Sequence, residues 1–331
     1  MRKKNLPVKR RGKISAASIF LIIISLLAFL FALYKIKTTP TVTDNGKSVL
    51  GAEKATELRG PQTTPPSSQS IITQEPEPEM PVFPKDITAK SYIVYDLDKK
   101  KVLAQKNSEM ALPPASTTKM VTALVALDEF ALNKHVTVPK ECVGLPGVNI
   151  GFSAGDELSV QQLLYALLLP SASDAACTLA YADGNPSMFL AKMNKKAEEL
   201  GLKHTYFENE IGLDDENHFS SAEDLLAIAR YAMQNIKFMQ IVGAPYYNVR
   251  AYNSDHTYRV DNTNELLSYV PGTVGIKTGY TDNASGCLVY AYENKAVGKR
   301  AIIVVMGSAG SEGEKRFTDT KELLDWFLSV P

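Results

Sequence analysis

The chain has 331 residues, and its 36 basic and 36 acidic side chains give a formal net charge of zero. The charge is uneven, because residues 1–37 hold nine basic residues and no acid, which leaves a net charge of −9 on the other 294 residues. That acidic remainder excludes a general nucleic-acid-binding surface. Hydrophobic residues at 45% and aromatic residues at 8% are typical of a globular protein.

Residues 14–33 form an uncharged apolar run that follows seven basic residues between Arg2 and Lys13. Twenty residues at about 1.5 Å rise span the roughly 30 Å hydrocarbon core of a bilayer. We therefore expect a basic cytoplasmic tail and a transmembrane anchor over residues 1–37. A cleavable signal peptide is the alternative, but its apolar segment would be about 7–15 residues long and would end in a small-residue cleavage site. No such site follows Leu33.

Residues 38–86 contain eight of the 18 prolines, among threonine, serine, glutamine and glutamate. Such a composition buries too little apolar surface to offset the entropy of ordering, so we expect a disordered linker. A flexible coil of 49 residues has a root-mean-square span of roughly 40 Å. Residues 87–331 then form one folded domain on the outer side of the membrane.

In chain order, the folded domain begins with two short strands in residues 91–104, around a turn at Asp98. Helices are expected from apolar spacing and end signals at residues 116–130, 158–169, 174–182, 187–201 and 221–233. Three strands at 274–279, 286–292 and 300–306 and a helix at 318–328 follow. Because strands come first and last, we expect a mixed α/β (α+β) fold. Its antiparallel sheet is formed by both ends of the domain, with flanking helices and a helical middle region.

The sequence offers no pattern for a metal centre or an organic cofactor, and we expect neither. The cysteines, Cys142, Cys177 and Cys287, are far apart without a C-x-x-C pair, and no histidine lies in H-E-x-x-H. A domain outside the cell could instead hold one disulfide and one unpaired thiol, and this alternative stays open. Three buried, reduced cysteines are the favoured interpretation.

Three short motifs occur in order: Ser-Thr-Thr-Lys at 116–119, Ser-Ala-Ser-Asp at 171–174 and Lys-Thr-Gly at 277–279. A lysine three residues after a serine at a helix start can reach the serine hydroxyl. It can act as a base only if its pKa falls well below about 10.4. Burial lowers that pKa, and so does a second cation, for which Lys277 is the candidate. Each motif alone is common by chance. Only the combination of the three motifs in this order, behind an expected membrane anchor, indicates a serine enzyme of this kind.

Together these motifs resemble those of the penicillin-binding serine D-alanyl-D-alanine carboxypeptidases, the low-molecular-mass group that trims peptidoglycan stem peptides. The resemblance covers residues 87–331 and includes Leu-Pro-Pro-Ala before Ser116 and Val-Gly-Ile before Lys277. It implies a β-lactamase/transpeptidase-like fold and a catalytic domain outside the bacterial cell membrane. The implied partners are the peptidoglycan stem peptide, β-lactam antibiotics as covalent inhibitors, and the membrane through the N-terminal helix, but not nucleic acid.

By this resemblance, Ser116 is acylated with release of the terminal D-alanine, Lys119 is the general base, and Ser171 is the second-motif serine. Ser171 would relay a proton between the lysines and the leaving amine. The backbone N–H groups of Ser116 and Tyr280 would form the oxyanion hole. The substrate-binding positions are Ser173, Lys277, Thr278, Gly279, Tyr280 and Arg316. Among these, Thr278 and Arg316 would hold the terminal carboxylate, and Gly279 would let substrate approach the strand edge.

One departure from the family pattern concerns the second motif, which is usually Ser-x-Asn and here has Ser173 in place of the asparagine. Serine is shorter, so the hydrogen bonds of the asparagine would be lost or made by a water. We therefore expect slower turnover or a shifted substrate preference. His218 is expected to shape a turn, because the mechanism does not need it.

Three other functions share parts of this pattern with a carboxypeptidase. A class A-like β-lactamase would need Ser-Asp-Asn in the second motif and a deacylating glutamate, and the second motif contradicts it. A peptidoglycan DD-endopeptidase is barely distinguished by the sequence. A catalytically weak, penicillin-binding wall protein is motivated by Ser173. The last two stay open as alternatives.

Overall fold

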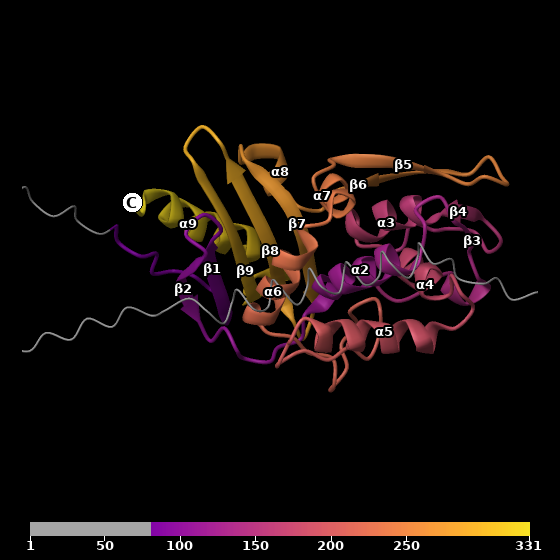
Figure 1. Cartoon of the computed structure of the whole chain (residues 1–331), viewed down its shortest axis with the longest axis horizontal. Helices are drawn as coiled ribbons and strands as arrows, with labels where there is room; N and C mark the ends of the chain where they lie inside the picture. Colours follow the sequence, from indigo (N-terminus) through magenta and orange to yellow (C-terminus); the bar gives the residue numbers. More distant parts are fainter. Residues whose placement is uncertain (1–80) are drawn as a thin grey trace, which may run out of the picture. The chain divides into compact units, whose positions relative to one another are not determined.

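The computed structural model describes residues 81–331 (Figure 1). The expected anchor and most of the expected linker lie outside the described residues. Within residues 81–331, no helix is both long enough and apolar enough to span a membrane.

The centre of the described structure is a five-stranded antiparallel sheet in the order β2-β1-β9-β8-β7. Its strands are β1 (Ser91–Asp96), β2 (Lys101–Lys106), β7 (Thr273–Thr281), β8 (Ser285–Asn294) and β9 (Lys299–Ser308). The first two strands come from one end of the domain and the last three from the other. The expectation that both ends share a sheet is therefore confirmed, and β7 is left as an edge strand.

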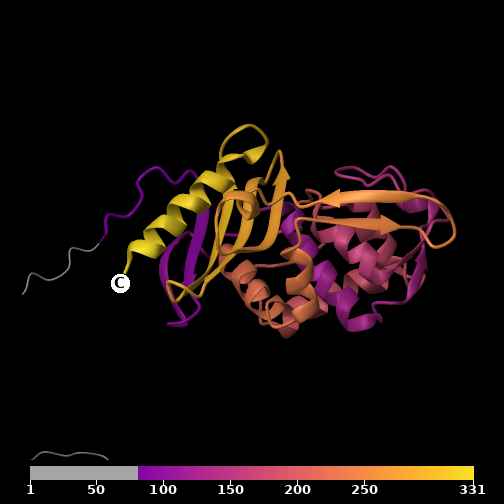
Figure 2. The same cartoon turned by 90° about the horizontal axis from the view of Figure 1, so that it is seen from above.

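Both faces of the sheet are buried, and the side chains of β9 show how. Ile302 and Val304 face a core shared with the helical region, whereas Ile303 and Val305 face a second core against α9 (Lys315–Ser329). A strand that is buried on both sides needs apolar residues at every position, which is why residues 301–306 are uninterruptedly apolar. Figures 1 and 2 show α9 lying along the sheet, away from the helices within residues 119–199.

The middle of the chain folds into helices that pack on the other face of the sheet. The longer ones are α2 (Lys119–Glu129), α3 (Val160–Leu168), α4 (Ser173–Ala180), α5 (Pro186–Glu199) and α6 (Ala222–Ala232). All five expected helices are present within a few residues of their expected bounds. Their start signals are real: the Ser159 hydroxyl accepts from Gln162 N, Asn185 precedes a proline at the first helical position, and Ser221 accepts from Asp224 N.

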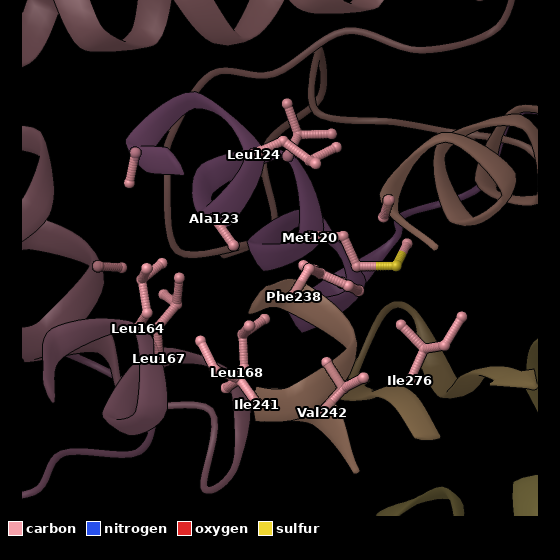
Figure 3. Close-up of a cluster of buried hydrophobic side chains, with 14 of the residues drawn as sticks. Met120, Ala123, Leu124, Leu164, Leu167, Leu168, Phe238, Ile241, Val242 and Ile276 are labelled. Carbon is pink, nitrogen blue, oxygen red and sulfur yellow. The ribbon is translucent and has the colours of Figure 1, made fainter. Parts of the chain in front are cut away.

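Apolar contacts join the helices to the edge strand β7 (Figure 3). Met120 of α2, Leu168 of α3, Val242 of α7 (Ile236–Val242) and Ile276 of β7 all belong to one buried cluster. The cluster places the start of α2 beside β7, although about 150 residues separate them. It is therefore the packing that brings the first motif to the third.

Several short elements were not expected from the sequence. They are the 3-10 turns η1 (Ala115–Thr118), η2 (Lys140–Cys142) and η3 (Ser311–Gly313), the helices α7 and α8 (Leu266–Tyr269), and two two-stranded antiparallel sheets. The first sheet pairs β3 (His135–Thr137) with β4 (Glu157–Ser159), and the second pairs β5 (Tyr246–Arg250) with β6 (Thr257–Asp261). Most span seven residues or fewer, which is too short for a periodic pattern to stand out. The β5–β6 connection also has no Asn-Gly or Asp-Gly turn.

The cysteines differ from the favoured interpretation. Cys142 and Cys177 form a disulfide with their Cα atoms 5.5 Å apart, and Cys287 is buried and unpaired. The interpretation as three reduced cysteines is therefore wrong, and the alternative of one disulfide with a leftover thiol is correct. The pairing depends on η2 lying against α4, 35 residues along the chain, and no local pattern reveals that contact.

The last residues of the expected linker already contact the folded domain. The ring of Phe83 lies 4.8 Å from that of Trp326 on α9 and 6.0 Å from that of Tyr92 on β1, measured between centroids. The backbone N–H and the hydroxyl of Thr88 both donate to Asp319 of α9. The chain thus enters the domain along α9.

Candidate active site

The serine of the first motif lies on η1. The backbone at Gly212 and at Gly279 packs closely against this turn. Ala115 adopts a left-handed backbone conformation (φ +48°), and Ser116 itself is half-buried. A Cβ on Gly279 of β7 would lie 3.1 Å from Ser116 N, and a Cβ on Gly212 would lie 2.2 Å from the Ala115 carbonyl oxygen. Gly279 was expected to give room to a substrate. The structure shows that it gives room to the turn that carries Ser116.

Lys119, the first residue of α2, is 1% exposed and donates from Nζ to Ser116 Oγ at 3.1 Å. The i, i+3 contact expected from the motif is therefore made. Burial lowers the pKa of Lys119 to about 7, although the charges of Glu210 and Asp174 act in the opposite direction. A lysine with this pKa is half neutral near pH 7, so its nitrogen can accept a proton from a hydroxyl.

Lys277 lies on β7, 1% exposed, and its Nζ donates to the Thr278 carbonyl at 3.0 Å. Burial, and then the charges of Lys119 and Arg316, hold the pKa of Lys277 well below its usual value. The sequence predicted that a second cation would lower the pKa of Lys119. In the structure, burial is the largest influence on the pKa of Lys119, and the repulsion between the two lysines contributes to the lowered pKa of Lys277.

Thr278 follows Lys277 on β7, and Arg316 of α9 lies close enough for its charge to act on Lys277. The Thr278 hydroxyl is 2.6 Å from that of Thr263, whose N–H and hydroxyl both donate to the Leu169 carbonyl. Arg316, at the start of α9, donates from Nη1 to two carbonyls of η3, and its guanidinium lies 4.5 Å from the ring centroid of Phe317. Its buried Nε has no hydrogen-bond partner within residues 81–331.

Tyr280 continues β7 beyond the third motif and is 38% exposed, with its hydroxyl donating to Asp282 Oδ1 at 3.0 Å. Because β7 is the last strand of the sheet, its outer edge has no neighbouring strand to pair with its backbone groups. The oxyanion-hole role of the Tyr280 N–H stays a prediction. An edge strand beside Ser116 is nevertheless suited to bind an extended peptide.

The second motif lies at the start of α4. Ser171 has a left-handed backbone (φ +73°) and is 7% exposed, and its hydroxyl has no hydrogen-bond partner in the described part of the chain. Ser173 N donates to the Val148 carbonyl at 2.6 Å, and a Cβ on Gly147 would lie 3.0 Å from Ser173 Oγ. Strained, unpaired serine groups are typical of functional sites. Ser173 packs against a loop, here called the disulfide loop (residues 143–152).

Some functional positions carry no signal in the sequence. Asn209 holds the loop that supplies the carbonyl group for Lys119, and Thr263 orients Thr278. Each is a polar loop residue far from any motif, so only the folded chain shows its role. No group of three or more His, Cys, Asp or Glu side chains within residues 81–331 is arranged to hold a metal ion.

His218 packs behind the site, with the structural role expected for it. Its Nδ1 accepts from Glu208 N at 3.2 Å, so the neutral ring donates from Nε2 to the Thr118 hydroxyl at 2.8 Å. Burial lowers the pKa of His218 to about 4. The ring is therefore uncharged near neutral pH and connects η1 to the loop after residue 207.

Known proteins share this arrangement. A family model for D-alanyl-D-alanine carboxypeptidases (peptidase family S11) matches residues 75–310. The D-alanyl-D-alanine carboxypeptidase DacF of Bacillus subtilis is 36% identical over 247 residues, which are 73% of this chain and 62% of that protein. DacB2 of Mycobacterium tuberculosis is 38% identical over 248 residues, 74% of this chain and 84% of that protein. The chain thus spans less than two thirds of the length of DacF.

Solved structures confirm the expected fold class. A D-alanyl-D-alanine carboxypeptidase from M. tuberculosis aligns with a TM-score of 0.70 at 36% identity, covering 77% of this chain and 96% of that one. A Streptomyces DD-transpeptidase aligns with a TM-score of 0.70 at 31% identity, covering 75% of this chain and 100% of that one.

Proposed function

The chain belongs to the D-alanyl-D-alanine carboxypeptidase family, and from that premise we propose that it removes the terminal D-alanine from peptidoglycan stem pentapeptides through an acyl-enzyme. The observation that carries the proposal is the pair formed by Ser116 Oγ and Lys119 Nζ, 3.1 Å apart, in which burial lowers the lysine pKa to about 7. A nucleophile needs such a base within hydrogen-bond reach.

The proposed reaction has two steps. Ser116 Oγ attacks the carbonyl carbon of the penultimate D-alanine, and its proton passes to Lys119 Nζ. The peptide C–N bond then breaks, and the leaving amine takes a proton from Lys119, with the Ser171 hydroxyl as the relay. In the second step water attacks the ester and regenerates the serine. The backbone N–H groups of Ser116 and Tyr280 would stabilise the oxyanion in both steps.

Recognition of the free carboxylate is assigned to Lys277, Thr278 and Arg316. The substrate is anionic at this end, and these residues gather positive charge and hydroxyl donors at the edge strand β7. An incoming carboxylate would raise the pKa of Lys277, because it favours the ammonium form that burial disfavours. The same site would accept β-lactam antibiotics as covalent inhibitors.

We further propose that the enzyme is a single-pass protein of the bacterial cell membrane, with its catalytic domain outside. The apolar run at residues 14–33 behind a basic cluster supports this proposal. The disulfide between Cys142 and Cys177 supports it independently, because such bonds persist in oxidising compartments. Residues 38–86 would then serve as the tether.

Two measurements test the activity. Wild-type protein should be labelled covalently by a fluorescent penicillin, and Ser116→Ala should not; label that persists in the variant would refute the nucleophile assignment. Mass spectrometry of a stem pentapeptide digest should then show the loss of one D-alanine. Cleavage of cross-linked peptides would instead support a DD-endopeptidase, and labelling without any turnover would support a wall-binding protein.

A further inference from the structure

The carbonyl group that contacts the general base belongs to a loop built around one side chain. Residues 209–213, here called the asparagine loop, lie between α5 and α6. Asn209 Oδ1 accepts from the backbone N–H groups of residues 211, 212 and 213, at 3.3, 2.7 and 3.0 Å. Its Nδ2 donates to the Leu213 carbonyl at 3.1 Å. Four hydrogen bonds from one amide thus close the loop on itself.

This closure turns the Ile211 carbonyl toward the site. Lys119 Nζ donates to that oxygen at 2.5 Å and contacts Ser116 Oγ at 3.1 Å. In the same loop, the backbone of Gly212 lies against the Ala115 carbonyl. The asparagine loop therefore touches both the residue that precedes the nucleophile and the base that activates it.

A neutral lysine amine has two N–H groups and one lone pair. When one N–H is directed at the Ile211 carbonyl, the lone pair can be directed at the Ser116 hydroxyl, from which it takes the proton. The ammonium that results keeps its hydrogen bond to the same carbonyl. The carbonyl thus orients the base before proton transfer and stabilises it afterwards.

We propose that Asn209 is a positioning residue for acylation: through the asparagine loop it holds the Ile211 carbonyl against Lys119 and so orients the base toward Ser116. It acts through the loop and does not touch the reacting atoms. The inference deepens the proposed function and rests on it.

The surroundings of Lys119 indicate what loss of the loop would do. The charged and titratable groups around it are Glu210 of the loop, Asp174 of α4, Lys277 of β7 and His218, and Arg316 of α9 acts in turn on Lys277. Burial is the largest influence on the pKa of Lys119, and it lowers that pKa. An opened loop admits water, so the pKa of Lys119 rises toward its ordinary value and less of the lysine is neutral near pH 7.

The test is the rate of acylation by a fluorescent penicillin between pH 5.5 and 9, measured on the full chain as wild type and as Asn209→Ala. We expect Asn209→Ala to react on the order of 10- to 100-fold more slowly at pH 7, because misplaced catalytic groups lose this much. Its acid limb should move upward by about half a pH unit or more. Asn209→Asp keeps the three acceptor bonds, but its negative charge would raise the pKa of Lys119. It should therefore recover most of the rate at high pH, where Lys119 is neutral in both proteins.

The matched control is Asn194→Ala, because Asn194 also clamps the backbone nearby, through two 2.9 Å hydrogen bonds to the N–H and the carbonyl of Phe207. The Asn194 side chain makes no hydrogen bond to the asparagine loop. Asn194→Ala should therefore lower Tm and leave the acid limb of the pH profile in place. Equal shifts of the limb in the two alanine variants would overturn the proposal, and so would a wild-type rate in Asn209→Ala. If wild type itself fails to react, the proposed function fails instead.

Discussion

Two loops flank the candidate site, and they are held in different ways. The asparagine loop is closed by hydrogen bonds to one amide and packs on Ala115 and Lys119, beside the proposed nucleophile. The disulfide loop is anchored to α4 by the bond between Cys142 and Cys177, and by the Asp174 carboxylate, which accepts from Gly151 N and Phe152 N. It packs on the second motif through Gly147 and Val148.

Because the two loops are held differently, we expect one to affect the acylation rate and the other to affect the free energy of unfolding. A cross-link stabilises chiefly by restricting the unfolded chain, so the disulfide loop should matter most for unfolding. The asparagine loop contributes few bonds, but one of them ends on the general base, so it should matter most for acylation. The experiments below compare the two loops, from the largest expected effect to the smallest.

Gly212→Ala should give the largest loss of activity. Its Cβ would lie 2.2 Å from the Ala115 carbonyl oxygen, at a backbone φ of +82° that disfavours alanine. The turn carrying Ser116 must then move, and we expect penicillin acylation to slow by about 100-fold or more.

Gly201→Ala is the matched control for Gly212→Ala. Gly201 has a φ of +69°, but nothing lies within 4 Å of its Cβ position. It should lose about 1–2 kcal/mol of unfolding free energy to backbone strain and keep its acylation rate. An equal loss of rate in the two variants would show that backbone strain, and not contact with Ala115, sets the effect.

Removal of the disulfide should change stability more than rate. The bond closes a loop of 35 residues, for which the chain-entropy estimate is about 3–4 kcal/mol of unfolding free energy. Urea unfolding of Cys142→Ser/Cys177→Ser should show this loss, with acylation reduced less than in Gly212→Ala. Reductant should destabilise wild type to the same degree and leave the double variant unaffected. A disulfide variant that loses acylation as severely as Gly212→Ala would contradict the separation of roles.

Ser173→Asn should cost stability, because the Ser173 hydroxyl lies so close to Gly147 that a Cβ there would be only 3.0 Å from it, and the longer amide must fit beside the same backbone. Overpacking of this kind costs about 1–3 kcal/mol in unfolding free energy. The acylation rate should also change, since the added amide reaches into the second motif. Ser173→Ala, which only removes the hydroxyl, is the control. Wild-type stability and wild-type rate together in Ser173→Asn would show that the replacement of asparagine by serine has no consequence here.

The pH dependence of acylation should follow Lys119. The base must be neutral, and its pKa is about 7, so the rate should fall roughly tenfold per pH unit below that value and level off above it. His218, with a pKa near 4, is neutral throughout this range. His218→Gln should therefore leave the acid limb where it is. Movement of the limb in that variant would assign the titration to the histidine.

Local patterns predicted much of this molecule. The six expected helices and five sheet strands depend on periodicity and end signals within a few residues, and the Ser116–Lys119 contact depends on one helical turn. Burial of Lys119 could not be read from the motif, since Ser-x-x-K is compatible with a solvated lysine. It follows from the packing of α2 against β7 and the asparagine loop.

The amino acids alone showed the apolar run at residues 14–33, the composition of residues 38–86 and the order of the three motifs. They also predicted that both ends of the folded domain pair in one sheet. The partner of Cys142, the carbonyl that meets Lys119 and the glycine that faces Ser173 could not be inferred in this way. Those contacts join residues 26 to 92 positions apart. Helical and strand periodicity carries information over a few residues, whereas contacts at such separation are set by how whole elements pack.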